Sequence, residues 1–125
     1  MADEQLLIAE RIQKEIEQSE SQFREFKSAC ERDAAGNMKR RPAKEIAVHI
    51  AQELVAFANA DGGLLLVGVE DDGVVTGVPH SDDKVQVMLN SPKTHVHSDA
   101  PLPSPVVRKV EIDGKTVLYF TCQKV

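Results

Sequence analysis

The stretch Asn59-Ala60-Asp61-Gly62-Gly63-Leu64-Leu65-Leu66-Val67-Gly68-Val69 decides the fold of this chain. Its first five residues predict the end of a helix, because Asn and Gly readily adopt the left-handed conformation that closes one. The six residues that follow, Leu64–Val69, are apolar throughout apart from Gly68. Such a run predicts a central strand that is covered on both faces of its sheet.

A helix is expected immediately before this strand. Pro42 suits the first turn of a helix, where its missing N–H costs no hydrogen bond. The apolar residues Ile46, Ile50, Leu54 and Phe57 then recur at spacings of four, four and three, which places them on one helical face. The pattern predicts a helix that begins at Pro42 and packs on the sheet.

The remaining segments complete a mixed fold. Further helices are expected over Leu6–Ser19 and from Ser81 to about Leu89, and further strands over Gln22–Ala29, Val74–Val78, Val106–Ile112 and Thr116–Gln123. The polar segment Cys30–Arg41 and the proline-rich segment Asn90–Pro105 are expected to be loops. The order predicts an α+β fold of two layers, with a mixed, mostly antiparallel sheet packed against helices.

Size and composition exclude several classes of protein. A chain of 125 residues with 42% hydrophobic and 28% charged residues is typical of one globular domain. No apolar run is long enough to cross a bilayer, and the acidic N-terminus is unlike a signal peptide. Cys30 and Cys122 lie too far apart in sequence for a zinc or disulfide framework. We therefore expect a cytoplasmic protein with no membrane partner.

One basic segment stands out in an acidic chain of net charge −5. Lys39, Arg40, Arg41 and Lys44 lie beside the start of the predicted second helix, where backbone N–H groups also favour phosphate. They are the candidate nucleic-acid-binding residues, although a solvated basic loop would have the same composition. Since Tyr119 is the only Tyr and there is no Trp, binding would be mostly electrostatic and sensitive to salt.

Three stretches together resemble the Schlafen AlbA-2 domain family: Glu20–Lys27, Ala56–Gly63, and Leu66–Gly73 with Gly77 after it. The resemblance runs from about Glu20 to the C-terminus. It implies a Schlafen AlbA-2-like domain over 20–125, preceded by an N-terminal helical extension over 1–19. It also implies a domain that binds DNA or RNA and that occurs in bacteria alone or at the head of longer transcriptional regulators.

The same resemblance implies a set of acidic site residues. Eukaryotic Schlafen ribonucleases cleave structured RNA such as tRNA with three acidic residues and a metal ion. Glu20 and Glu25 match the first two positions, and Asp71 matches the third, with Glu70 and Asp72 as alternatives. This chain departs from those enzymes in having one such module rather than two, and a longer loop between the first two stretches.

The chemistry of the residues that the resemblance implies is compatible with a metal site. Mg²⁺ or Mn²⁺ prefers carboxylate oxygens, and Lys27, which shares a strand face with Glu25, could neutralise a substrate phosphate. Convergence of Glu20 with Glu25 requires a bend near Ser21, because residues five apart share no face of a strand or helix. Each residue also has an interpretation without a metal. Glu20 could be a solvated acid at a helix end, Glu25 and Lys27 could form a cross-strand ion pair, and Asp71 could serve an acidic hairpin turn.

The leading hypothesis is thus a nucleic-acid-binding domain of a transcriptional regulator. The alternative is a metal-dependent endoribonuclease that uses Glu20, Glu25, Asp71 and Lys27, with Mg²⁺ or Mn²⁺ as its cofactor. A third hypothesis is a homodimer formed through Ile8, Ile12 and Ile16 of the first helix. No Walker-type ATPase motif is present, because the glycine needed five residues before Gly114-Lys115-Thr116 is Lys109.

Overall fold

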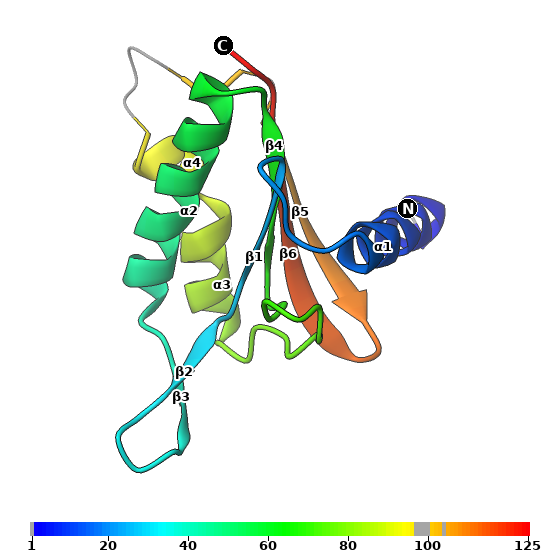
Figure 1. Ribbon diagram of the computed structural model, residues 1–125. Helices are drawn as coiled ribbons and strands as arrows, with labels where there is room; N and C mark the ends of the chain where they lie inside the picture. The colour runs from blue at the N-terminus through cyan, green and yellow to red at the C-terminus, as the bar shows by residue number, and fades with distance from the viewer. Residues whose placement is uncertain (1, 97–100, 104) are drawn as a thin grey trace.

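The computed structural model describes residues 2–96, 101–103 and 105–125. Its ten helices and strands (Figure 1) follow the chain in this order: α1 (Ala2–Glu17), β1 (Arg24–Lys27), β2 (Cys30–Arg32), β3 (Met38–Arg40), α2 (Ala43–Asn59), β4 (Gly63–Val67), α3 (Asp82–Leu89), α4 (Ser91–Thr94), β5 (Val106–Ile112) and β6 (Lys115–Cys122). The sequence prediction of the second helix and of the final hairpin is confirmed almost to the residue. None of the described helices combines the length and the apolar character needed to cross a membrane.

Four strands form the main sheet in the order β1-β4-β6-β5. β1 runs parallel to β4, whereas β4 with β6 and β5 with β6 are antiparallel pairs. The predicted mixed, mostly antiparallel sheet is therefore confirmed. β1 and β5 are its two edges, and β4 lies inside it.

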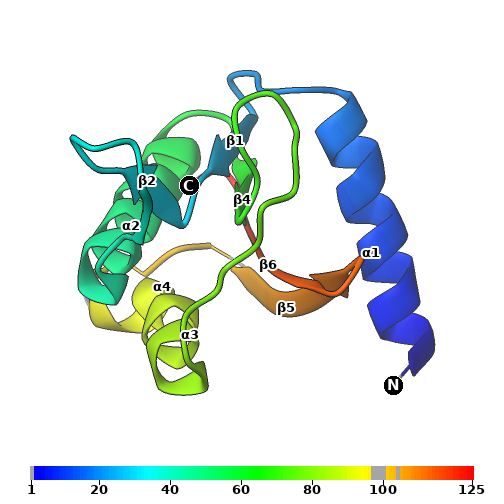
Figure 2. The ribbon, with the colours of Figure 1, turned by 90° about the horizontal axis from the view of Figure 1, so that it is seen from below.

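Both faces of this sheet are covered (Figure 2), and β4 contributes to both cores. Leu65 and Val67 pack with α2 and α3 in one buried cluster, while Leu64 and Leu66 belong to a second cluster that includes Ile12 of α1. Alternate residues of a strand point to opposite faces, so an uninterrupted apolar run is what this position requires. The expected α+β fold holds for the domain over 20–125, and α1 adds a third layer on its far side.

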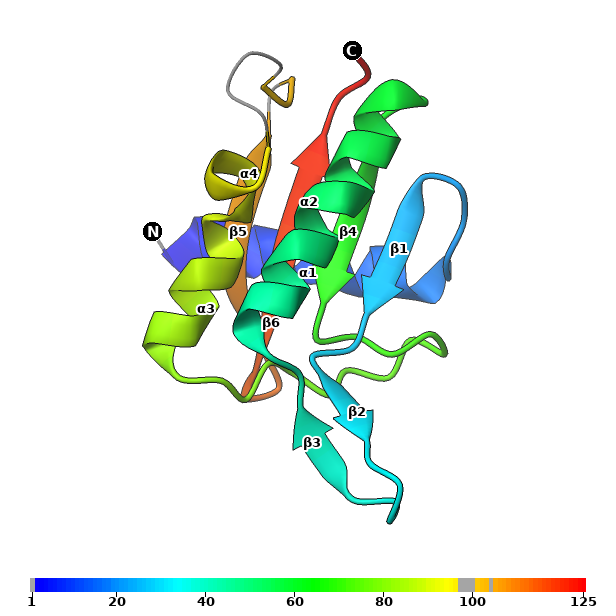
Figure 3. The same ribbon diagram turned by 90° about the vertical axis from the view of Figure 1, so that its left-hand side faces the viewer.

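The segment Cys30–Arg41 is not the loop that its polar composition predicted. It forms the two-stranded antiparallel hairpin β2–β3, which projects from the lower end of the domain (Figure 3). The turn is held by Asp33, whose Oδ1 accepts hydrogen bonds from the backbone N–H groups of Ala35 and Asn37 at 2.9 Å each. The prediction failed because solvent reaches most of this hairpin, so it carries none of the apolar alternation that marks a half-buried strand.

The segment Val74–Val78 is likewise not the strand that was expected. It forms one isolated bridge, between Val69 and Val75, and then bends at Gly77 toward β6, where the Val78 N–H donates to the Thr116 carbonyl at 2.8 Å. The physical reason is that β1 and β6 already occupy both edges of β4. A hairpin partner for β4 therefore had no free edge to pair with.

The proline-rich segment after α3 contains the short helix α4, which the sequence did not predict. Ser91 at its start is fully buried, and its hydroxyl donates a hydrogen bond to the Ala47 carbonyl of α2. This contact fixes α4 against α2, because a buried hydroxyl without a partner would be costly. Residues 97–100 and 104 of the expected loop lie outside the described residues.

Candidate functional site

The two faces of edge strand β1 carry different chemistry. Phe26 faces α1, and so does Arg24, whose Nε lies 2.5 Å from Glu15 Oε2. Glu25 and Lys27 alternate onto the opposite face, where the charge of Glu53 on α2 acts on Glu25. The predicted common face of Glu25 and Lys27 is therefore present, and it lies on the α2 side of the sheet.

Glu20 reaches the same place through a tight reversal of the chain. Ser19 adopts a positive φ of 59°, and Ser21 forms a bridge with Arg24 through two backbone hydrogen bonds of 2.9 and 3.2 Å. The Arg24 guanidinium also donates to the Ser19 carbonyl at 2.9 Å. This is the bend that the spacing of Glu20 and Glu25 required, and it lays Glu20 beside β1.

Asp71 approaches from the turn that follows β4. Its two acidic neighbours have other partners: Glu70 accepts a hydrogen bond from the Thr76 hydroxyl at 2.6 Å, and Asp72 accepts one from the Val74 backbone N–H at 3.0 Å. Asp71 instead interacts with Glu20. Of the three acids that the sequence left open, Asp71 is thus the one that meets the carboxyl groups of β1.

Burial and neighbouring carboxyl groups raise the pKa values of Glu20 and Glu25. Burial, a hydrogen bond with Asp71 and the charge of Glu25 together raise the pKa of Glu20 from 4.5 to about 7. Burial is also the main reason that the pKa of Glu25 lies above its usual value, and Glu53 adds to it while Lys27 opposes it. The structure therefore brings Glu20, Glu25, Asp71 and Lys27 into one electrostatic cluster.

The acids form a row rather than a closed ring. Glu20 interacts with both Asp71 and Glu25, whereas Asp71 acts on Glu25 through its charge. Among the described residues, no group of three or more His, Cys, Asp and Glu side chains is arranged to hold a metal ion. Carboxylates are the right ligands for Mg²⁺ or Mn²⁺ in kind, but a shared site would require these three side chains to rearrange.

The predicted basic residues have separate roles in the structure. Arg40 and Arg41 line one cavity between the hairpin and α3, and Lys44 lines a second cavity between α2 and α3. Lys39 stands opposite Glu31 in the hairpin register and alternates onto the other face from Arg40. The structure therefore gathers three of the four residues and leaves Lys39 apart.

Arg41 is engaged in holding the structure together. Its guanidinium contacts Glu45 at 2.9 Å, His49 Nδ1 at 2.8 Å and the Ser28 carbonyl at 3.3 Å, and only 13% of its side chain is exposed. These contacts tie the end of β3 to α2 and to the residue after β1. Arg41 positions the hairpin and has little charge left for a ligand.

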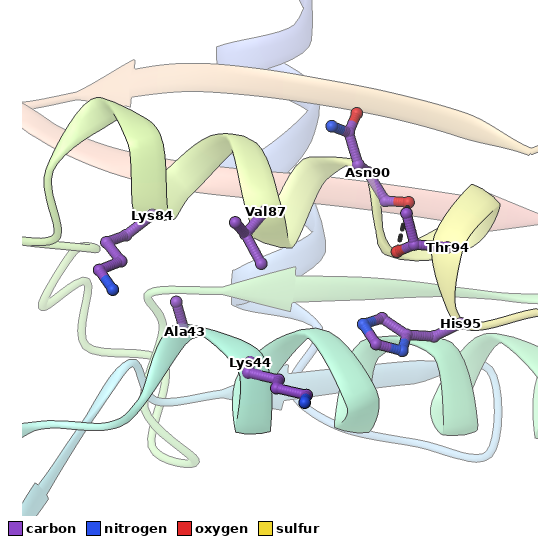
Figure 4. A pocket seen from close by; sticks show the side chains of 7 residues that line it. All are labelled: Ala43, Lys44, Lys84, Val87, Asn90, Thr94 and His95. Carbon is purple, nitrogen blue, oxygen red and sulfur yellow. Dashed lines mark hydrogen bonds between the residues drawn. The ribbon is translucent and has the colours of Figure 1, made fainter.

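Lys84 is a cavity residue that the sequence analysis missed. It lines both cavities from α3, opposite Ala43 of α2, as Figure 4 shows for the larger one. Nothing in the sequence singled it out, because a lone lysine on an amphipathic helix is ordinarily part of a solvated face. Only the packing of α3 against α2 reveals its position.

The glycine pair that ends α2 serves packing. A Cβ on Gly63 would lie 2.4 Å from Cδ1 of Phe57, and a Cβ on Gly62, whose φ is +82°, would lie 3.0 Å from the Cys122 carbonyl oxygen. The Asp61-Gly62-Gly63 segment thus stops the helix and lets β4 pass close to its end. This agrees with the sequence prediction that these residues end the helix.

The comparisons identify the family. The model of the family described as "Schlafen, AlbA_2" matches residues 20–125. This chain therefore belongs to the Schlafen AlbA_2 family, as the three sequence stretches indicated.

Two solved structures share the fold. The DIP2311 protein from Corynebacterium diphtheriae is 26% identical with a TM-score of 0.57, over 83% of this chain and 18% of that one. The N-terminal domain of the Putative ATP-dependent DNA Helicase RecG-related Protein from Nitrosomonas europaea is 20% identical with a TM-score of 0.53, over 94% of this chain and 73% of that one. This chain thus spans about a fifth of the length of the Corynebacterium protein.

Proposed function

We propose that this chain is the nucleic-acid-binding domain of a transcriptional regulator and that it grips the phosphate backbone of DNA or RNA through its basic segment. The observation that carries the proposal is the position of Arg40 and Lys44. Each lines a surface cavity, and neither has an ion pair or side-chain hydrogen bond with the described residues. Cations without a partner are available to phosphate oxygens.

The surroundings of these residues favour an extended ligand. Arg40 lies on the projecting β2–β3 hairpin (Figure 3) and Lys44 on the first turn of α2, and the two cavities that they line share Ala43 and Lys84. Membership of the Schlafen AlbA_2 family supports the same class of ligand. Because the chain is acidic overall, binding would depend on this local arrangement rather than on net charge.

The test is equilibrium binding to tRNA, single-stranded DNA and duplex DNA, measured by fluorescence anisotropy at several salt concentrations. We expect the affinity to fall steeply as the salt concentration rises. In a plot of the logarithm of the binding constant against the logarithm of the salt concentration, the magnitude of the slope should decrease by about one in Arg40→Ala and in Lys44→Ala. Lys14→Ala is the matched control, because Lys14 lies on α1, on the other side of the sheet. An affinity that does not change with salt concentration, or an equal loss of affinity in all three variants, would refute the proposal.

A second candidate function is a metal-dependent endoribonuclease that acts on structured RNA. It is favoured by the row of interacting acids, because burial together with the neighbouring Asp71 and Glu25 raises the pKa of Glu20 to about 7. Holding like charges together is unfavourable unless a cation or proton compensates them. Bound Mg²⁺ or Mn²⁺ would supply charge stabilisation and a more acidic water.

The side chains would then have distinct tasks. Glu20, Glu25 and Asp71 would hold the cation, and Lys27 would neutralise the charge that builds on the phosphate. Lys27 is placed for this because its charge acts on Glu25 across the same strand face. None of these tasks requires the basic hairpin, so the two proposed functions can be tested separately.

Two measurements test the nuclease proposal. Mn²⁺ should raise the melting temperature of the parent protein and of Glu10→Gln, whose site lies on α1, but not that of Glu25→Gln. The parent should also cleave tRNA only with Mn²⁺ or Mg²⁺, and Glu25→Gln should not, while its circular dichroism spectrum stays unchanged. Equal cleavage by Glu25→Gln and the parent would exclude this mechanism.

A further inference from the structure

Two neighbouring cavities between the hairpin, α2 and α3 share part of their lining. The smaller, of about 280 Å³, is lined by Arg40, Arg41, Pro42, Ala43, His80, Ser81 and Lys84. The larger, of about 410 Å³, is lined by Ala43, Lys44, Lys84, Val87, Asn90, Thr94 and His95 (Figure 4). Ala43 and Lys84 belong to both linings, so a ligand in one cavity can extend into the other.

The smaller cavity has an excess of available positive charge. Arg40 and Lys84 have no ion pair or side-chain hydrogen bond with the described residues, whereas the charge of Arg41 is compensated by Glu45 at 2.9 Å. The exposed acids Asp82 and Asp83 in the first turn of α3 are not among the residues that line it. Arg40 and Lys84 thus bring two uncompensated positive charges to the lining of the smaller cavity.

Backbone donors reach the same space. α2 and α3 both begin at this cavity, and neither Pro42 nor Ser81 caps its helix with a side-chain hydrogen bond. The first backbone bonds run from Ile46 to Pro42 and from Val85 to Ser81, so the preceding N–H groups of each helix have no partner within it. Free N–H groups at a helix start favour an anion.

One buried polar atom adds independent support for a missing ligand. His80 also lines the smaller cavity, and its Nε2 lies 2.7 Å from the Arg41 carbonyl oxygen, which fixes the ring. Its Nδ1 is buried and has no hydrogen-bond partner, and it is the only such side-chain atom in the described part of the chain. Because Nε2–H donates to the carbonyl, Nδ1 is left as an acceptor, so its missing partner is a hydrogen-bond donor such as a ligand hydroxyl rather than a phosphate oxygen.

The larger cavity has a different character. Val87 and Ala43 give it apolar walls, and Asn90, Thr94 and His95 add polar groups at one end (Figure 4). Its volume falls in the range of small-ligand sites, which combine an apolar lining with a few polar groups. A flat, partly polar group such as a nucleoside suits these walls.

We propose that this double cavity binds the terminal nucleotide of a nucleic-acid strand, with the end phosphate beside Arg40 and Lys84 and the nucleoside against Val87. The inference rests on the proposed nucleic-acid binding and names the part of the ligand that this surface selects. A terminal phosphate carries close to two negative charges, whereas a phosphate within the strand carries one. Two unpaired cations together with two helix starts match the terminal group better.

The experiment compares four forms of one twelve-nucleotide strand: with a 5′-phosphate, with a 3′-phosphate, with hydroxyls at both ends, and with a 5′-phosphate on an abasic end residue. Anisotropy should show about tenfold tighter binding of one phosphorylated form than of the hydroxyl form, as expected for added charge-assisted hydrogen bonds. Equal affinity for all strands would overturn the inference. Undiminished binding of the abasic strand would overturn the placement of the nucleoside, provided that the 5′-phosphate is the preferred end.

Variants assign the preference to the cavity. Lys84→Ala should weaken binding of the phosphorylated strand by a larger factor than binding of the hydroxyl-ended strand, and so abolish the preference for the phosphorylated end. Lys84 is exposed on α3, where alanine is well tolerated, so this variant should keep its melting temperature. Lys14→Ala, with the same change of charge on α1, should retain the preference. If no strand of any form is bound, the proposed function itself fails; if strands are bound without regard to their ends, only this inference fails.

Discussion

The guanidinium of Arg24 joins the carboxylate of Glu15, with Nε 2.5 Å from Oε2, and so connects edge strand β1 to helix α1. The same guanidinium donates to the Gln18 side chain at 3.0 Å and to the Ser19 carbonyl at 2.9 Å. One side chain thus fixes both the helix and the reversal that carries Glu20 toward Glu25. The N-terminal extension is connected in this way to the acidic cluster.

We expect Glu15→Gln to lower the free energy of unfolding by about 1 kcal/mol, because it removes the charge from a partly buried, hydrogen-bonded pair. Urea denaturation measures this change, and amide hydrogen exchange in α1 should become faster. Glu17→Gln is the control, since Glu17 is exposed two residues further along the helix. Equal effects of the two substitutions would mean that the Arg24 contact contributes nothing specific.

The acidic cluster should make stability depend on pH. The pKa of Glu20 is about 7 in the folded chain and 4.5 when unperturbed, so between these values the folded state holds a proton that the unfolded state has released. The free energy of unfolding contributed by this group is therefore present below pH 4.5 and lost as the pH rises through 7. Glu20→Gln should remove this decrease in the free energy of unfolding, because glutamine does not titrate.

We expect Glu20→Gln to be more stable than the parent at pH 8, by about 1 kcal/mol because solvent screens this partly exposed group, and equally stable at pH 4. Urea denaturation at pH 4, 6 and 8 measures the difference. Glu10→Gln on α1 should follow the parent at every pH. A constant difference across the pH range would contradict the assigned pKa.

Arg40 and Arg41 are neighbours in sequence but should respond differently to substitution. Arg41→Ala should lower the free energy of unfolding by about 1–2 kcal/mol, because it leaves Glu45 and the Ser28 carbonyl without their donor. Arg40→Ala should change it by less than about 0.5 kcal/mol, as is usual for an exposed residue. Thermal and urea denaturation of the two single variants measure this. Similar losses in both would contradict the positioning role of Arg41.

Gly63→Ala should destabilise the domain by about 1–3 kcal/mol, since its Cβ would lie 2.4 Å from Cδ1 of the Phe57 ring. Substituting Phe57 by Leu should recover part of that loss, which a double-mutant cycle detects. Gly114→Ala is a useful contrast, because its φ of +78° strains alanine while no atom lies within 4 Å of the added Cβ. Its cost should not depend on residue 57.

Dimerisation through α1 stays a prediction, and the structure restricts how it could occur. Ile12 is fully buried, and Ile8 and Ile16 pack against the same cluster of the chain's own sheet. Leu6 and Leu7 are 60% and 65% exposed on that helix. If the chain dimerises through α1, sedimentation of Leu6→Ser/Leu7→Ser should give a smaller mass than the parent.

The elements that could be predicted are those whose buried residues recur at a regular spacing in the sequence. The stripe of Ile46, Ile50, Leu54 and Phe57 indicated α2, and the run Leu64–Val69 indicated a strand covered on both faces. The hairpin β2–β3 was missed because exposed strands need no apolar alternation. The strand expected after the Asp71 turn was wrong because β4 already had both of its partners.

The sequence by itself determined the composition of the site: which acids, which cations, and the bend that Glu20 and Glu25 would need in order to meet. Only the tertiary structure decided that Asp71 rather than Glu70 or Asp72 completes the row, that the Arg41 guanidinium is already paired, and that Lys84 lines the same cavity as Arg40. The physical reason is that spacing along a chain sets which residues share one helix or strand face, whereas the pairing of side chains from different elements depends on how those elements pack.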